Sequence, residues 1–467
     1  MNRVFSILFL VSSQLVFDTT STSGLLVLEQ SEIPNLIVNL TGHTDDSHAV
    51  AWSPDGSLLA SGSDSSDCSV RIWDWQEQQQ QGGGGDALFV LRGSNMGVNC
   101  GITSLDWSPD GTKLLAGRFR NEINLWNITD GTLLWAIGDL TNRTYSSQVS
   151  VAWHPSGEFF AASIHNVTML LNSTNGEELN DISSQQYESV NSIAWSPMGR
   201  YLAIGSGMMP SGVPEIENNI KIWDRNTDAY IHTLTLHTNA ITAVTWSPDG
   251  ARLVSASLDQ TCKIWNVASE TVVRTLGVGV TRGFQALDYS SDGTLIASGS
   301  YDHSVQIWDA FNGMELARFF SASESKYGRD YVIMDVAWHP TMNILALSKW
   351  ESSDSRHRVK TVEIWDISGV RATGSESPTH SPVSSSPISS SSTAAPSSLR
   401  VSLVPTESPS ILLVPTEPPI SADELSNITM QSLSPSASTT DDPASSASKT
   451  FCNCVLALLL GISILVF

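Results

Sequence analysis

The segment Trp246-Ser-Pro-Asp-Gly-Ala-Arg-Leu-Val-Ser-Ala-Ser257, followed by Ile264-Trp-Asn266, decides the fold of this 467-residue chain. Proline at the second position of Ser247–Gly250 presets φ and glycine closes the turn, so these four residues predict a tight hairpin turn between two strands. In the flanking runs 241–246 and 251–257, the residues that face either side of the strand include apolar or β-branched ones. We therefore expect both faces of this sheet to be covered by neighbouring structure.

The same frame recurs seven times along the chain. The copies are separated by 55, 46, 42, 51, 43 and 49 residues and begin at Trp52, Trp107, Trp153, Trp195, Trp246, Tyr289 and Trp338. This is the period of a four-stranded propeller blade with loop insertions. One blade cannot bury its apolar faces alone, whereas seven blades closed into a ring can. The sequence thus predicts an all-β, seven-bladed propeller.

The Trp-Ser-Pro-Asp-Gly and Ile-Trp-Asp motifs resemble those of the WD-repeat family, over roughly residues 36–367. The resemblance implies that a hydrogen-bonded set of histidine, serine, aspartate and tryptophan pins each blade. The matching positions are His43, Asp67 and Trp73 in blade one, His237, Asp259 and Trp265 in blade five, and Asp302 and Trp308 in blade six, which lacks the histidine. In blade five, either Ser255 or Ser257 would supply the hydroxyl.

The other blades depart from this pattern. Arg120, Glu217 and Val359 stand at the aspartate position of blades two, four and seven, and blade three ends in Leu171-Asn172, where the second tryptophan is expected. We expect packing, more than the polar network, to hold these blades. The resemblance also implies that a strand from the N-terminal side, residues 35–40, completes the last blade.

The chain changes character outside the propeller. Residues 1–23 form an expected signal peptide with a basic start and an apolar core, and residues 24–371 form the propeller. Residues 372–450 are rich in serine, threonine and proline and predict a disordered segment, either a glycosylated stalk or an ordinary disordered tail. Residues 451–467 are apolar but shorter than the ~20 residues of a spanning helix.

This short tail, with small residues upstream, is typical of a glycolipid-anchor signal attached at or near Ser445. A tail anchor is the alternative. Asn142 and Asn427 are the candidate glycosylation sites. Cys68 and Cys100 fall in turns that would lie on the same face of adjacent blades, so they are either a disulfide or two free cysteines.

Composition and motifs exclude several function classes. The net charge of -23, without a basic run, argues against a nucleic-acid partner. No His/Cys set has metal-ligand spacing, and no glycine-rich phosphate loop follows a strand, so no metal or cofactor is expected. His154 and His339 replace the serine of the Ser-Pro turn and are expected to be structural. No residues suggest a catalytic site.

Three functions are therefore open: a non-catalytic protein-interaction platform at the cell surface, an intracellular WD-repeat scaffold, and a propeller hydrolase. The first is the leading hypothesis, with a membrane-anchored, extracellular location and protein partners of unknown identity. The family resemblance places partner binding at the turns that precede each first strand and join the second and third strands. Repeat alignment puts there Phe119, Tyr145, Tyr187, Arg282, Tyr301, Asp330 and Tyr331.

Overall fold

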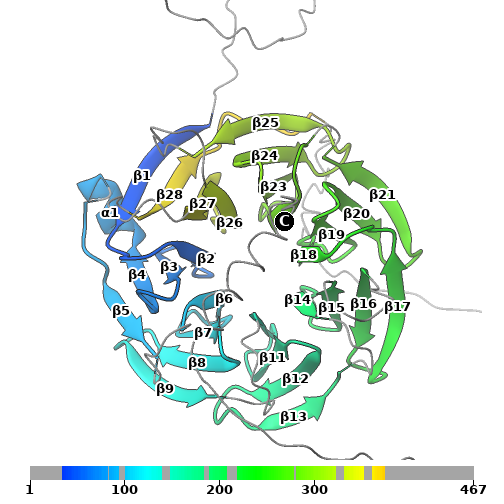
Figure 1. Ribbon diagram of the computed structural model, residues 1–467, viewed down its shortest axis with the longest axis horizontal. Helices are drawn as coiled ribbons and strands as arrows, with labels where there is room; N and C mark the ends of the chain where they lie inside the picture. The colour runs from blue at the N-terminus through cyan, green and yellow to red at the C-terminus, as the bar shows by residue number, and fades with distance from the viewer. Residues whose placement is uncertain are drawn as a thin grey trace, which may run out of the picture. The chain divides into compact units, whose positions relative to one another are not determined.

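The computed structural model describes residues 34–82, 84–93, 100–138, 148–183, 189–207, 218–277, 280–321, 331–351 and 360–373. All of them belong to one compact unit, Met1–Ser381. In this part of the chain, the strands form seven four-stranded antiparallel sheets. The sheets stand as blades in a ring (Figure 1), and the predicted seven-bladed propeller is confirmed.

Each blade runs from an inner strand to an outer one. The inner strands are β2 (Ser47–Trp52), β6 (Ile102–Trp107), β10 (Val149–Trp153), β14 (Val190–Trp195), β18 (Ile241–Trp246), β22 (Phe284–Tyr289) and β26 (Tyr331–Trp338). The second strands are β3 (Leu58–Ser63), β7 (Lys113–Arg118), β11 (Phe159–Ile164), β15 (Tyr201–Ser206), β19 (Arg252–Ser257), β23 (Leu295–Ser300) and β27 (Ile344–Glu351).

The third and outer strands complete the blades. The third strands are β4 (Ser69–Asp74), β8 (Glu122–Asn127), β12 (Val167–Asn172), β16 (Asn219–Asp224), β20 (Cys262–Asn266), β24 (Ser304–Asp309) and β28 (Thr361–Asp366). The outer strands are β5 (Phe89–Arg92), β9 (Thr132–Ile137), β13 (Glu178–Asp181), β17 (Ala229–Thr235), β21 (Thr271–Leu276), β25 (Glu315–Phe320) and β1 (Asn35–Thr41). Helix α1 (Trp75–Gln81) follows β4.

The ring closes through the first strand of the chain. β1 pairs antiparallel with β28, from Asn35 opposite Asp366 to Thr41 opposite Thr361. In Figure 1 the dark blue β1 lies beside the yellow β28, so the two ends of the repeat region share blade seven. The expectation that an N-terminal strand completes the last blade is confirmed.

The Ser-Pro-Asp-Gly turn folds as its residues dictate. In blade one, the Gly56 amide donates to the Ser53 carbonyl at 2.8 Å, and the Asp55 carboxylate accepts the Ser57 amide at 3.0 Å. Gly56 has φ +73°, a left-handed conformation that favours glycine. The turn therefore joins the inner and second strands of this blade, and the same four residues stand between these strands in blades two and five.

The apolar core lies between blades as well as within them. One cluster joins Ile72 of blade one to Trp107 and Trp126 of blade two. Gly62 makes room for this contact, because a Cβ on it would lie 2.4 Å from the Ile102 side chain. Close stacking of neighbours explains why both faces of each sheet are apolar. Among the residues that the structure describes, no helix is long and apolar enough to span a bilayer.

Candidate functional site

Blade one contains the complete polar network that the sequence predicts. The Trp73 indole Nε1–H donates to Ser61 Oγ at 2.8 Å, and Ser61 Oγ lies 2.8 Å from His43 Nε2. His43 Nδ1 lies 2.8 Å from Asp67 Oδ2. Because an indole N–H only donates, the serine hydroxyl is left to donate to the imidazole. The chain of donors thus runs from tryptophan to aspartate and ties β4 to the loop before β2.

Blade five repeats this network. His237 Nδ1 lies 2.7 Å from Asp259 Oδ2, and Nε2 lies 2.7 Å from Ser255 Oγ. The Trp265 indole donates to the same Ser255 hydroxyl at 2.8 Å. Ser255 therefore supplies the hydroxyl, whereas Ser257 donates to the Asn239 carbonyl.

Electrostatics fixes the protonation of the network. Burial lowers the pKa of His43, despite the opposing effect of Asp67. Burial alone would raise the pKa of Asp67, but hydrogen bonds from His43 and Ser69 hold it well below its usual range. A neutral imidazole therefore faces an ionised carboxylate at neutral pH, and these groups serve the fold.

In blade six a glutamine stands in for the absent histidine. The Trp308 indole donates to Ser298 Oγ at 2.8 Å, and Ser298 Oγ donates to Gln306 Oε1 at 3.1 Å. Asp302 accepts the Ser304 amide at 3.1 Å and so stabilises its own turn. Gln306 was not predicted, because it lies on the third strand β24, two residues before Trp308, whereas the family histidine precedes the inner strand.

Blade two was expected to be held by packing more than by the family network, and the structure adds a buried polar cluster of other residues. Arg118 is fully buried, and its guanidinium donates to Glu122 Oε1 at 2.9 Å and to Asn124 Oδ1 at 3.1 Å. Its Nε and Nη2 also donate to the Cys100 carbonyl, at 3.2 and 3.0 Å. A buried ion pair with satisfied hydrogen bonds thus occupies this blade.

Blade seven also contains a buried polar cluster of other residues. Lys349 is buried, with 5% of its surface exposed. Its Nζ lies 2.8 Å from Glu363 Oε1 and 3.0 Å from Ser321 Oγ. The Trp365 indole donates to Glu363 Oε2 at 3.0 Å. The carboxylate takes the place of the serine as acceptor for the tryptophan, so this blade is also held by buried polar groups.

The predicted contact face is only partly described. Arg282 is exposed before β22, whereas Phe119 in the β7–β8 turn and Tyr301 in the β23–β24 turn are half-buried. Tyr331 is 2% exposed, so its assignment to the exposed face is wrong. It begins β26 and packs against His303, with ring centroids 5.3 Å apart. The remaining candidates lie outside the described residues: Tyr145, Tyr187 and Asp330.

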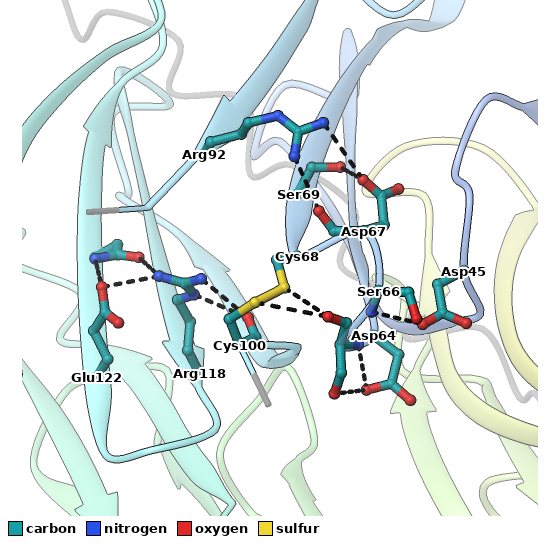
Figure 2. The surroundings of a disulfide bond; sticks show 12 residues. Asp45, Asp64, Ser66, Asp67, Cys68, Ser69, Arg92, Cys100, Arg118 and Glu122 are labelled. Carbon is teal, nitrogen blue, oxygen red and sulfur yellow. Dashed lines mark hydrogen bonds and ion pairs between the residues drawn. A yellow bond between two sulfur atoms is a disulfide. The ribbon is translucent and has the colours of Figure 1, made fainter. Parts of the chain in front are cut away.

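Cys68 and Cys100 are joined by a disulfide in the structure, with Cα atoms 5.3 Å apart. Cys68 ends the β3–β4 turn, and Cys100 precedes β6 of the next blade. Figure 2 shows the bridge between Asp67 and Arg92 on one side and Arg118 and Glu122 on the other. Of the two alternatives from the sequence, the structure contains the disulfide.

Three inner-strand aspartates join neighbouring blades and were missed from the sequence. Asp106 Oδ2 accepts the Trp153 amide at 2.6 Å, and Asp288 Oδ2 accepts the Trp338 amide at 2.7 Å. Asp335 Oδ2 accepts the Val50 amide at 3.0 Å across the closing junction.

Burial raises the pKa of each of these three carboxyl groups, Asp106, Asp288 and Asp335, to about 7. The charge of Asp288 adds to the shift at Asp335. All three groups therefore favour the neutral form as the pH falls below 7.

The two turn histidines, which follow Trp153 and Trp338, also join neighbouring blades. His154 Nε2 lies 2.9 Å from the Gly199 carbonyl, and His339 Nε2 lies 3.0 Å from the Gly56 carbonyl. Since a carbonyl only accepts, Nε2 carries the proton in both rings. His339 Nδ1 accepts the Met342 amide at 3.1 Å. Both histidines therefore occupy structural positions.

The remaining candidates cannot be placed. Asn142, Asn427 and Ser445 lie outside the described residues. Within the described ranges, no three His, Cys, Asp or Glu side chains are grouped as metal ligands would be.

Seven repeated blades around one axis, closed by an N-terminal strand, define a β-propeller built from sequence repeats. A family model described as "WD domain, G-beta repeat" matches residues 34–74, 85–127, 177–224, 229–266 and 273–309. The chain belongs to the WD-repeat family. The matches omit most of blade three, where Leu171 replaces the tryptophan.

Curated relatives agree with this assignment. The F-box-like/WD repeat-containing protein TBL1Y of Homo sapiens is 28% identical over 235 residues, which cover 46% of this chain and 39% of that protein. The WD40 repeat-containing protein HOS15 of Arabidopsis thaliana is 27% identical over 266 residues, covering 53% of this chain and 39% of that protein. The chain thus spans well under half the length of these relatives.

Proposed function

We propose that this protein is a WD-repeat scaffold that binds protein partners as an adaptor of a multiprotein complex. The closed ring of seven WD-repeat blades carries this proposal, because such a ring presents two sets of turns on a rigid frame. The relatives whose names pair WD repeats with an F-box-like element support it, since the stretch similar to this chain covers 39% of each of them.

The proposed contact face is the end of the ring at which the second strands turn into the third strands. Arg282 and Tyr301 of blade six and Phe119 of blade two lie there. Aromatic and arginine side chains are the usual anchors of protein interfaces. Tyr145, Tyr187 and Asp330, which lie outside the described residues, remain part of this proposal.

Affinity purification with paired variants tests the scaffold. Tagged full-length chain is purified from its native source, and bound proteins are quantified by mass spectrometry. Arg282→Ala with Tyr301→Ala should reduce the capture of stoichiometric partners at unchanged melting temperature. The matched control is Met198→Ala with Phe311→Ala, which removes side chains that are 88% and 63% exposed at the opposite ends of the strands. Equal losses in both pairs, or no stoichiometric partner, would refute the proposal.

Display of the propeller at the cell surface is a second candidate. The Cys68–Cys100 disulfide favours it, because disulfides persist in oxidising compartments and are rare in the cytosol. The apolar segments 4–17 and 455–467, the Ser/Thr/Pro-rich segment and lipid attachment near Ser445 belong to this candidate.

The two locations are separated by treating intact cells with a phosphatidylinositol-specific phospholipase. Release of a propeller that lacks residues 455–467 would support surface display. Retention of a chain that still contains this peptide, with free thiols at Cys68 and Cys100, would support the intracellular adaptor.

A further inference from the structure

The junction between blades one and two differs from the other junctions in the described residues, because it carries a covalent link. Cys68 and Cys100, 3% and 2% exposed, bridge the β3–β4 turn to the segment before β6 across 32 residues of sequence. In Figure 2 the bridge lies directly beside the Arg118 side chain. The link therefore joins two turns that each belong to a buried polar network.

On the blade two side, the Cys100 carbonyl is an acceptor for a buried charge. Arg118 donates two hydrogen bonds to it, and burial lowers the pKa of the guanidinium despite the opposing charge of Glu122. A buried cation that loses an acceptor is strongly destabilised. The position of the Cys100 backbone thus affects the stability of the Arg118–Glu122 pair.

Gly101, the next residue, links this segment to the partly exposed β7–β8 turn. The Gly101 carbonyl accepts the Phe119 amide at 2.9 Å in the β7–β8 turn. A Cβ on Gly101 would lie 2.7 Å from Asp64 Oδ1 of blade one, so this backbone is closely packed against the neighbouring turn. Residues 100–101 therefore hold the corner of blade two.

We propose that the Cys68–Cys100 disulfide is a redox-dependent latch on the β7–β8 corner of blade two. A dithiol reductant supplies two electrons and two protons, the S–S bond breaks, both cysteines become thiols, and the reductant becomes a disulfide. Residues 100–101 then lose their covalent tether to blade one, and the hydrogen bonds to Arg118 and Phe119 open more often. Because both cysteines are buried, reduction follows local opening and is slow.

Amide hydrogen exchange on the purified full-length chain tests the latch. Peptides covering β7–β8 are followed in the oxidised protein, in the protein reduced with a phosphine, and in the Cys68→Ser/Cys100→Ser variant. Two internal controls are blade five, which has the network of blade one without a bridge, and blade seven, which has the buried cation Lys349 without a bridge. Reduction should speed exchange in β7–β8 by roughly tenfold and leave β19–β20 and β27–β28 within about twofold.

Three results would overturn the proposal: free thiols at both positions in protein from the native source, equal exchange in the oxidised and reduced protein, or equal acceleration in all seven blades. The last result would indicate that the disulfide stabilises the whole ring and not the β7–β8 turn in particular. If the serine variant does not fold, the comparison of oxidised with reduced wild type still tests the latch, because both samples have the same sequence. A Cys262→Ser variant controls for effects of the reductant on the buried free cysteine.

Discussion

The third-strand tryptophans of different blades donate to chemically different acceptors. Trp73 and Trp265 donate to a serine that also contacts histidine, Trp308 to a serine that contacts glutamine, and Trp365 to the Glu363 carboxylate. In each case the acceptor is buried and has a second partner. The requirement at this position is therefore a satisfied indole N–H, and no particular residue is needed to meet it.

Ser255→Ala tests this requirement. The substitution leaves the Trp265 indole N–H and His237 Nε2 without their shared partner, so we expect a loss of about 1–3 kcal/mol in the free energy of unfolding. Urea denaturation followed by tryptophan fluorescence measures it. Ser269→Ala, at an exposed turn position of the same blade, is the control. Equal stability of the two variants would contradict the structural role of the network.

Asp288 gives a pH-dependent prediction. Its pKa is raised to about 7 by burial, so between pH 4 and 7 the folded protein binds the proton more than the unfolded chain does. The stability that this group contributes is present at low pH and lost as the pH rises through 7. Asp288→Asn keeps an acceptor for the Trp338 amide and removes the charge.

We therefore expect the free energy of unfolding of Asp288→Asn, relative to that of wild type, to be about 1–2 kcal/mol higher at pH 8 than at pH 5. This range allows for partial exposure of the carboxyl group. Chemical denaturation at both pH values measures the change. Asp249→Asn is the control, because hydrogen bonds from Ser247 and Ala251 lower the pKa of Asp249, and its titration falls below this window. Identical pH profiles for wild type and Asp288→Asn would show that the carboxyl is not buried as described.

Among elements, β1 has a special position because it is separated from its sheet partner by the whole ring. Its buried side chains, Val38 and Leu40, pack in a cluster with Val362 and Ile364 of β28 and with Trp52 of blade one. The strand thus closes blade seven and seals the junction with the first blade.

Leu40→Ala should destabilise the ring by about 2–5 kcal/mol, because Leu40 is 1% exposed and the change leaves a cavity at the closure. Ile37→Ala on the same strand, where the side chain is 38% exposed, should stay within about 0.5 kcal/mol of wild type. Thermal and urea denaturation compare the two. Similar losses in both variants would contradict the burial pattern of β1.

The elements were predictable because their signals are local. The Ser-Pro-Asp-Gly turn and the aromatic that precedes it recur at the period of a blade, and residues 35–40 precede the first copy. Contacts between blades, and buried ion pairs within a blade, left no comparable pattern. Asp106 accepts an amide 47 residues away, and the Arg118–Glu122 pair occupies positions where the family motif predicts neither charge. Tyr331 was assigned to the loop before β26, but the strand already begins at this residue, and its side chain is buried.

At the scale of the whole molecule, the ring presents two ends with different chemistry. One end carries the Ser-Pro-Asp-Gly turns, with exposed carboxylates such as Asp55 and Asp249. The other carries the Cys68–Cys100 bridge and the half-buried aromatics Phe119 and Tyr301. The scaffold proposal assigns partner binding to this second end.

Hydroxyl-radical footprinting of the chain, alone and in its purified complex, tests this claim most directly. Binding at the proposed face should protect peptides that contain Phe119 and Tyr301, while Met198 and Phe311 at the opposite end keep their rates of oxidation. Protection confined to Met198 and Phe311, or unchanged oxidation at both ends in the presence of a stoichiometric partner, would contradict it.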